Sequence, residues 1–431
     1  MGFYEILRKK GGAAILWGEI RKENDPKMHK KTVRDLDLAG KKVLMRVDYN
    51  VPMDELGGIT DDARIRETLP TLQYLFDAGA AVILMAHFGR PKGKVVDSLR
   101  LSPVARHLQD LLARDVQIST DCVGLEAQAL AKNLAPGQVL LLENVRFYAQ
   151  EEANDPEFAA QLAGLGDIYV NDAFGAAHRA HASTEGVARA MKSAGKPCVA
   201  GLLMARELEF LGQLLQNPAR PFVAILGGVK VSDKIGVIRN LLPKVDTLIV
   251  GGAMGYAFEK AKGHEVGTSF FKAEDAPIAG ELMQLAQDNG YDFRLPQDFL
   301  VADRDAEDAS VEFVPSGGIP ADKMGMDIGP KTIADYTSVI ENAKTVLWNG
   351  PMGRFEVKPF ENGTFEVAKA VGRATEKGAL TVIGGGDSAA AVKKMGLSDK
   401  MSHVSTGGGA SLEFLEGAEL PGVAVLDNRV S

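Results

Sequence analysis

The sequence has little cysteine, no long apolar run and no excess of positive charge. Each of these absences argues against a class of protein. Among its 431 residues are only Cys122 and Cys198, too few for a disulfide framework and compatible with a reducing cytoplasm. No apolar run approaches the roughly 20 residues that cross a bilayer. The formal net charge of −8 disfavours a protein held to nucleic acid mainly by phosphate contacts. We therefore expect a cytoplasmic protein that binds neither membranes nor nucleic acid.

Two common nucleotide-binding motifs are also missing. The predicted first strand, residues 43–47, is not followed by the G-x-G-x-x-G fingerprint of dinucleotide-dependent dehydrogenases. The phosphate-binding loop G-x-x-x-x-G-K-[ST] is absent as well. A dehydrogenase and a P-loop kinase are therefore disfavoured.

The composition is that of an ordinary globular protein, with 45% hydrophobic and 25% charged residues. The length suffices for two domains with separate cores. Residues 1–30 mix basic and acidic side chains and lack the apolar core of a secretory signal. We interpret them as a poorly ordered N-terminal extension, either an upstream tail or the product of a misplaced start codon.

From Thr32 onward, short apolar runs alternate with helical patterns, which predicts βα units and parallel sheets. Residues 202–216 carry apolar side chains at helical spacing, and the proline-containing segment 217–221 ends that pattern. We read this segment as one helix that joins two halves. The apolar runs occupy residues 43–47, 81–86, 139–142 and 168–170 in the first half, and 222–226, 247–250, 345–348 and 381–383 in the second.

The runs of the first half end in charged or polar residues. Ligands of open parallel sheets bind at the carboxyl ends of the strands, so these side chains are expected along one edge. A solvated charged rim would explain any one arginine, but several at strand ends favour a cationic pocket for a small, multiply anionic ligand. The set comprises Arg46, Arg64, His87, Arg90, Arg146, His178, Arg179 and His181.

The runs of the second half all stop at or next to glycine, which indicates a backbone-lined surface for a nucleotide. Lys230 and Lys234 follow the first glycine pair. In residues 381–393, TVIGGGDSAAAVK, Asp387 and Ser388 give an N-cap signal after three glycines. The free N–H groups of such a helix start suit a phosphate. Asp387 fits there if Mg²⁺ lies between its carboxylate and the phosphates.

Taken in order, nine motifs resemble phosphoglycerate kinase: RVDYNVP, AHFGRPKG, LLENVRF, NDAFGAAHRAHAS, ILGGVKVSDK, IVGGAM, LWNGPMGRFE, VIGGGDS and HVSTGGGASLEFLEG. The resemblance extends from about Thr32 to Val425. It implies an α/β protein of two Rossmann-like domains, each a parallel sheet flanked by helices, joined by a hinge helix across a cleft. The implied divisions are residues 31–201 for 3-phosphoglycerate, 202–216 for the interdomain helix, 217–412 for the nucleotide, and 413–431 for a tail that returns to the N-terminal domain.

The implied activity is reversible, Mg²⁺-dependent phosphoryl transfer from 1,3-bisphosphoglycerate to ADP, giving 3-phosphoglycerate and ATP in glycolysis, by a protein that is usually monomeric. The implied catalytic residues are Arg64, Lys230, Lys234 and Gly386. The implied substrate-binding residues are Asp48, Asn50, Arg64, His87, Arg90, Arg146 and Arg179. The implied nucleotide-binding residues are Lys234, Gly251, Gly252, Gly325, Glu356, Gly385, Gly386, Asp387 and Ser388, with Asp387 meeting the metal.

Several positions depart from the family pattern without removing a charge or donor that the chemistry obviously needs. They are Ala86, Phe88, Arg206, Arg354 and Ser388. The acceptor in the reverse direction is a carboxyl group. Carboxyl pKa values lie at about 4, so this group is already ionised at neutral pH and no general base is required to remove a proton. A phosphohistidine intermediate on His87, His178 or His181 is disfavoured because direct transfer suffices and, in the family, a histidine of this set serves as a hydrogen-bonding substrate ligand. The competing hypothesis is a non-catalytic two-domain protein that closes on a phosphorylated metabolite.

Overall fold

The apolar runs of the first half form a six-stranded parallel sheet in the computed structural model, which describes residues 29–429. Its order is β3-β4-β2-β1-β5-β6. Every residue of β2 is buried, as expected for strands covered by helices on both faces. The strands are β1 (Lys42–Arg46), β2 (Ala81–Met85), β3 (Val116–Ile118), β4 (Val139–Leu141), β5 (Ile168–Asn171) and β6 (Cys198–Ala200).

The second half builds a second six-stranded parallel sheet of order β15-β14-β13-β7-β8-β9. Its central strand β13 is also fully buried and contains Trp348, one of the largest buried side chains. The two sheets confirm the predicted α/β fold. The strands are β7 (Phe222–Leu226), β8 (Thr247–Val250), β9 (Asp292–Arg294), β13 (Thr345–Asn349), β14 (Leu380–Gly384) and β15 (His403–Val404).

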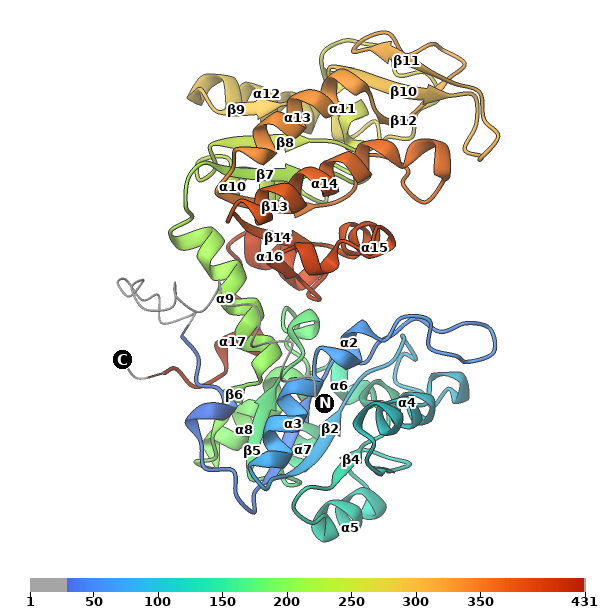
Figure 1. Ribbon diagram of the computed structural model, residues 1–431. Helices are drawn as coiled ribbons and strands as arrows, with labels where there is room; N and C mark the ends of the chain where they lie inside the picture. The colour runs from blue at the N-terminus through green and yellow to red at the C-terminus, as the bar shows by residue number, and fades with distance from the viewer. Residues whose placement is uncertain (1–28, 430–431) are drawn as a thin grey trace.

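A third sheet, antiparallel and three-stranded with order β11-β10-β12, was not predicted from the sequence. It comprises β10 (Asp298–Ala302), β11 (Val311–Pro315) and β12 (Met324–Ile328) and extends the second lobe (Figure 1). Only one residue of β11 is buried, so the strand lacks the alternation of apolar and polar side chains that marks a half-buried strand. The strands β3, β6, β9 and β15, each of two or three residues, were also not predicted from the sequence.

Helices cover the faces of both parallel sheets (Figure 1). None of the described helices is long and apolar enough to span a bilayer. The α-helices of the first lobe are α2 (Ala63–Arg66), α3 (Leu69–Asp77), α4 (Ser102–Leu112), α5 (Leu125–Asn133), α6 (Ala149–Glu152), α7 (Pro156–Ala163) and α8 (Val187–Ser193). Those that follow are α9 (Leu202–Gln216), α10 (Ile235–Leu241), α11 (Met254–Ala261), α12 (Asp275–Asn289), α13 (Pro330–Glu341), α14 (Asn362–Glu376), α15 (Gly386–Lys394), α16 (Gly409–Leu415) and α17 (Pro421–Ala424).

Short helical turns complete the description. They are the 3₁₀ turns η1 (Val33–Asp35), η2 (Asp97–Leu99), η3 (Val145–Phe147), η4 (Phe174–Ala176), η6 (Lys358–Phe360) and η7 (Ser398–Lys400), and the π-helical turn η5 (Ala182–Gly186). Two of them, η3 and η4, lie shortly after β4 and β5 of the first sheet, where charged motifs lie.

Helix α9 joins the two lobes, and the end of the chain returns to the first one (Figure 1). The backbone N–H of Lys31 donates to the carbonyl of Asp427 at 2.8 Å, and the Asp427 carboxylate accepts from the N–H of Cys198 at 2.9 Å. Lys30 and Asn428 form an isolated antiparallel bridge. The predicted N-terminal extension lies outside the described residues except for its last two positions.

Helix α2 lies at the edge of the first lobe that is turned towards the second, and α15 lies at the corresponding edge of the second lobe (Figure 1). Lys393 of α15 forms an ion pair with Asp61, just before α2, at 2.8 Å. Within α9, the buried Glu207 accepts from the N–H of Thr406 at 2.8 Å and contacts His403 Nε2 at 2.8 Å. Helix α9 is therefore anchored to the second lobe through one carboxylate.

Replacing Glu207 with glutamine tests this anchor. Burial alone would raise the pKa of Glu207, but the hydrogen bonds from His403 and Thr406 outweigh it and hold that pKa below its usual range. The carboxylate therefore stabilises the fold above its unfolded-state pKa, and this stabilisation is lost as pH falls through the folded-state pKa. We expect E207Q to lower the free energy of unfolding by about 2 kcal/mol at neutral pH, with a smaller difference in acid.

Urea denaturation at several pH values measures the effect. Glu209→Gln, at an exposed position of the same helix, is the matched control and should be nearly neutral. A loss for E207Q that is the same at neutral and acidic pH would contradict the argument.

Candidate active site

The loop after β1 and the start of α2 form one hydrogen-bonded unit. Arg64 Nη1 donates to the carboxylate of Asp48 and to the carbonyl of Asn50, each at 3.1 Å. The side-chain oxygen of Asn50 accepts from the N–H of Gly89 at 2.9 Å. The Arg64 side chain is 36% exposed, so a ligand can reach its guanidinium. Three predicted substrate residues thus lie together, fixed by one another.

His87 is held from beneath by Arg46. The arginine is 1% exposed, and its Nη2 lies 3.0 Å from His87 Nδ1. Arginine only donates, so Nδ1 must accept and the proton of the neutral imidazole lies on Nε2. Burial lowers the pKa of His87 well below its usual value, and the positive charges of Arg46, Arg146 and Arg64 add to that shift. The sequence placed Arg46 along the ligand edge, whereas the structure buries it under that edge.

Arg146 extends the same cluster from η3. Its Nη1 donates to the carbonyl of Gly89 at 3.0 Å, and its Nε lies 3.4 Å from the carboxylate of Glu152. Burial lowers the pKa of Arg146, and the charges of Arg46 and Arg179 act in the same direction. Like charges at this range repel one another. A multiply charged anion would relieve that repulsion.

Arg179 and Arg90 complete the predicted set. Arg179 Nε donates to His178 Nε2 at 3.1 Å, and its charge acts on both Arg146 and His181. Arg90 is exposed at the end of the segment that carries His87. The structure therefore brings Arg64, Arg146 and Arg179 close to His87 or to one another, as predicted.

On the opposite lobe, the glycine-terminated strand ends pack backbone to backbone. A Cβ on Gly252 would lie 2.5 Å from the nitrogen of Gly228, and one on Gly350 would lie 2.3 Å from the oxygen of Gly227. Gly252 and Gly350 also have positive φ angles of 71° and 97°. Only glycine tolerates both constraints. Gly251 follows β8, and its N–H donates to the carbonyl of Leu226 at 2.9 Å.

The two lysines of this lobe lie in different environments. Lys234 is 8% exposed, and its Nζ contacts the side-chain oxygen of Asn349 and lies 3.2 Å from the carbonyl of the same residue. Burial lowers the pKa of Lys234 to about 8, although the charges of Asp387 and Asp233 oppose the shift. Lys230 is one-third exposed and pairs with Asp233 at 3.6 Å.

Helix α15 begins at Gly386 and its N-cap is Gly385, with a φ of 85°. The sequence signal for Asp387 or Ser388 as the cap was therefore wrong, because the turn needs a positive φ that glycine adopts freely. Asp387 instead lies exposed in the first turn. The buried Ser388 hydroxyl accepts from the N–H of Gly350 at 2.5 Å, which ties the helix start to the end of β13.

Comparisons with known proteins agree with this arrangement. The family model described as phosphoglycerate kinase matches residues 33–418. The chain belongs to the phosphoglycerate kinase family. A curated phosphoglycerate kinase of Moorella thermoacetica is 56% identical over 402 residues, which cover 93% of this chain and 100% of the relative. Enzymes of this family are glycolytic phosphotransferases whose acceptor is a carboxyl group.

Solved structures show the same fold. Phosphoglycerate kinase from Coxiella burnetii superposes with a TM-score of 0.82 at 42% identity, covering 92% of this chain and 98% of that one. The enzyme from Pyrococcus horikoshii OT3 gives 0.79 at 33% identity with the same coverage of each chain.

The residues of this kinase fit a magnesium ion that arrives with a nucleotide. Among residues 29–429, no three His, Cys, Asp or Glu side chains gather into a metal-binding group. Asp387 is a single exposed carboxylate beside the helix start. Mg²⁺ commonly takes one or two carboxylates and keeps waters and phosphate oxygens as its other ligands, so one carboxylate suffices.

Two further predicted positions have local explanations. A Cβ on Gly325 would lie 2.4 Å from the Tyr256 ring, so packing alone requires glycine in β12. Glu356 lies in the turn after β13 and pairs with Arg354 at 3.2 Å, and Arg354 also pairs with Asp305 at 3.2 Å. The Arg354 departure from the family pattern therefore adds surface ion pairs beside the expected ribose site.

The other departures are accommodated as well. Phe88 is 7% exposed in the core of the first lobe, and its N–H donates to the side-chain oxygen of Asn144 at 3.1 Å. Arg206 contacts the Glu67 carboxylate, which links α9 to the segment between α2 and α3.

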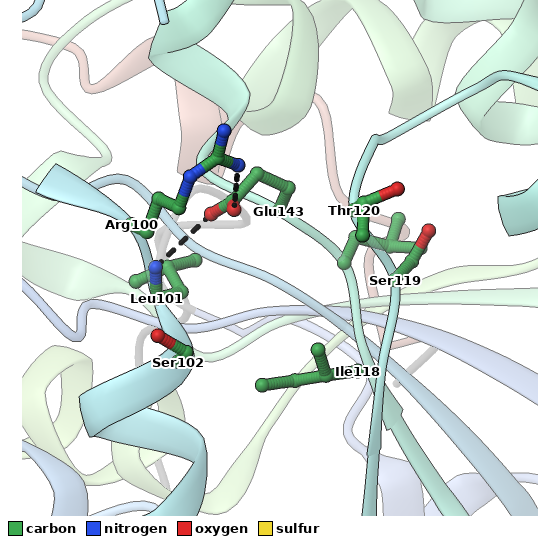
Figure 2. A pocket seen from close by; sticks show the side chains of 8 residues that line it. Arg100, Leu101, Ser102, Ile118, Ser119, Thr120 and Glu143 are labelled. Carbon is green, nitrogen blue, oxygen red and sulfur yellow. Dashed lines mark hydrogen bonds and ion pairs between the residues drawn. The ribbon is translucent and has the colours of Figure 1, made fainter. Parts of the chain in front are cut away.

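Sequence reasoning missed a cavity at the carboxyl ends of β3 and β4 (Figure 2). Its volume is about 440 Å³. Glu143 accepts there from Arg100 and from the N–H of Leu101, each at 3.0 Å. The acidic residue of the ENVR motif was the available signal. Its carboxylate holds the loop before α4 and is not part of the cation cluster.

The electrostatics of Lys234 lead to a prediction. An NMR pH titration of its side chain, assigned by comparison with Lys234→Arg, should give a pKa of about 8 in the free enzyme. Asp387→Asn should lower that pKa further, because the Asp387 charge favours the ammonium form. A titration near the ordinary lysine value of about 10.4 would contradict the burial of this amine.

Proposed function

We propose that this kinase transfers the acyl phosphate of 1,3-bisphosphoglycerate to ADP with Mg²⁺, giving 3-phosphoglycerate and ATP, and also runs in reverse. The observation that carries the proposal is the pairing of a cation cluster on one lobe with a glycine-lined helix start and a buried lysine on the facing lobe. This reaction is a step of glycolysis.

The first lobe would hold the glycerate. Its anionic groups would meet Arg64, His87, Arg90, Arg146 and Arg179, while Asp48 and Asn50 would hold the hydroxyl and carboxyl end. His87 would act as a neutral Nε2–H donor, since its Nδ1 is occupied by Arg46. The like charges around Arg146 favour a ligand with more than one negative charge.

The second lobe would hold the nucleotide. Gly251, Gly252 and Gly325 would border the adenine, and Glu356 would bind the ribose. The N–H groups at the start of α15, from Gly385, Gly386 and Ser388, would hold phosphates, with Asp387 meeting Mg²⁺. Bound Mg²⁺ would neutralise phosphate charge and orient the transferring group.

Phosphoryl transfer asks the protein mainly for alignment and positive charge. The acceptor carboxylate is already ionised, so no side chain needs to remove a proton. Arg64, Lys230, Lys234 and Gly386 would surround the moving phosphoryl group. Closure of the lobes about α9 would bring both ligands together and exclude water, which would otherwise hydrolyse the acyl phosphate.

A coupled assay that consumes 3-phosphoglycerate and ATP with Mg²⁺ tests the proposal. Turnover with these substrates supports it. Binding of both without turnover would favour the alternative, a non-catalytic protein that closes on a phosphorylated metabolite. We further propose a monomer in a reducing cytoplasm. The two buried free thiols fit a reducing compartment, and light scattering tests the oligomeric state.

Replacing Arg64 with alanine should lower kcat by about 100-fold or more, the cost of losing one preorganised transition-state donor. Arg66→Ala, two residues on, removes an exposed ion pair with Asp62 and is the matched control with nearly normal kcat. Steady-state kinetics measure both. A drop in kcat/KM with unchanged kcat for R64A would show that Arg64 acts only in substrate binding.

Replacing Asp387 with asparagine should weaken use of the Mg²⁺-nucleotide more than binding of the free nucleotide, because the carboxylate acts through the metal. The measurement is the Mg²⁺ dependence of kcat/KM beside the affinity for metal-free ADP. Glu361→Gln is the control, since it removes a carboxylate that pairs with Lys394 at the other end of α15. An unchanged Mg²⁺ dependence in D387N would remove Asp387 from the metal site.

A further inference from the structure

Glu151 is a fully buried carboxylate that the proposed chemistry does not use. It lies in α6 and is 0% exposed. Its Oε2 accepts from the backbone N–H of Ser183 at 2.8 Å, and its Oε1 accepts from the Ser183 hydroxyl at 2.6 Å. A buried carboxylate is costly unless it is paired and hydrogen-bonded, so its position calls for an explanation.

The explanation lies one hydrogen bond further on. Arg46 Nε donates to the Ser183 hydroxyl at 2.7 Å, and that hydroxyl in turn donates to Glu151. Arg46 Nη1 contacts the carbonyl of Val47, and Nη2 reaches His87 Nδ1 at 3.0 Å. Each nitrogen of the buried guanidinium therefore has its own fixed partner.

Charges of opposite sign lie along this series of hydrogen bonds from Glu151 to His87. Burial raises the pKa of Glu151, while the charge of Arg46 and the hydrogen bonds from Ser183 act against that shift. Arg46 lies below a cluster of cations, and Glu151 supplies the opposite charge on its far side. The side chains of Glu151, Ser183, Arg46 and His87 are 0%, 0%, 1% and 6% exposed, so water cannot take the place of any partner cheaply.

We propose that Glu151 and Ser183 are positioning residues that lock Arg46 in place, so that His87 presents only its Nε2–H to the bound phosphoglycerate. The inference deepens the proposed function, since it takes His87 as a substrate ligand. Without Arg46, the neutral His87 ring could carry its proton on either nitrogen and could rotate. The Nε2–H donor would then be lost for part of the time.

The test is the tautomer of His87, read by ¹⁵N NMR of histidine-labelled enzyme. The chain has seven histidines, and comparison with His87→Gln assigns the signal. The wild type should show a neutral ring with its proton on Nε2. Ser183→Ala and Glu151→Gln should both shift the His87 nitrogen signals toward a mixture of forms, and should raise KM for 3-phosphoglycerate about tenfold, as expected for loss of an outer-shell partner, with KM for ATP unchanged.

The matched control is Glu185→Gln. Glu185 lies in the η5 turn and, like Glu151, is a buried carboxylate. It accepts a hydrogen bond from Asn154 at 2.7 Å and contacts Arg189, whereas Glu151 accepts from Ser183. This variant should leave the His87 signals and both KM values unchanged. Should E151Q fail to fold, S183A removes a single hydroxyl and carries the test alone.

Two outcomes overturn the proposal in different ways. Unchanged His87 signals in folded S183A and E151Q would show that the buried chain does not position the ring. Suppose instead that the His87 signals shift in S183A and E151Q, but that these variants and H87Q all keep a normal KM for 3-phosphoglycerate. That result would overturn the substrate-binding role that the proposed function gives to His87.

Discussion

The concentration of positive charge at one sheet edge is the constraint on which the rest of this structure depends. Arg64, Arg146 and Arg179 come from separate segments. Burial depresses the pKa of Arg146, and the charges of Arg46 and Arg179 lower it further. Such a cluster persists only if the surrounding fold over-determines it. The buried strands β1, β2 and β4 supply that rigidity, since they are covered on both faces and cannot shift to separate the charges.

The two lobes offer two different kinds of anion-binding surface. One offers side-chain charge that suits a small anion, and the other offers backbone N–H groups that suit polyphosphate. Neither surface is complete alone, because phosphoryl transfer needs both reactants aligned and dry. Helix α9 connects the two surfaces, and it is anchored by Glu207 on one side and by Arg206 on the other.

Buried polar residues below the site carry as much of its geometry as the residues at its surface. Arg46 fixes the tautomer of His87, and Asn50 fixes the N–H of Gly89. Lys234 likewise depends on Asn349, the last residue of β13. His87 and Lys234 are thus each oriented by a buried partner, which preorganises these two side chains.

The sequence by itself determined the α/β class, the central strands and the motifs that identify the family, because long apolar runs and glycine or arginine at their ends are local patterns. It also named the residues that gather at each sheet edge, since parallel strands end on the same side. Only the tertiary structure decided that Arg46 is buried, that Gly385 caps α15, and that an antiparallel sheet, in which β11 is the mostly exposed strand, extends the second lobe. These features depend on contacts between residues far apart in the chain, and burial and hydrogen-bond partners of that kind leave no local signal.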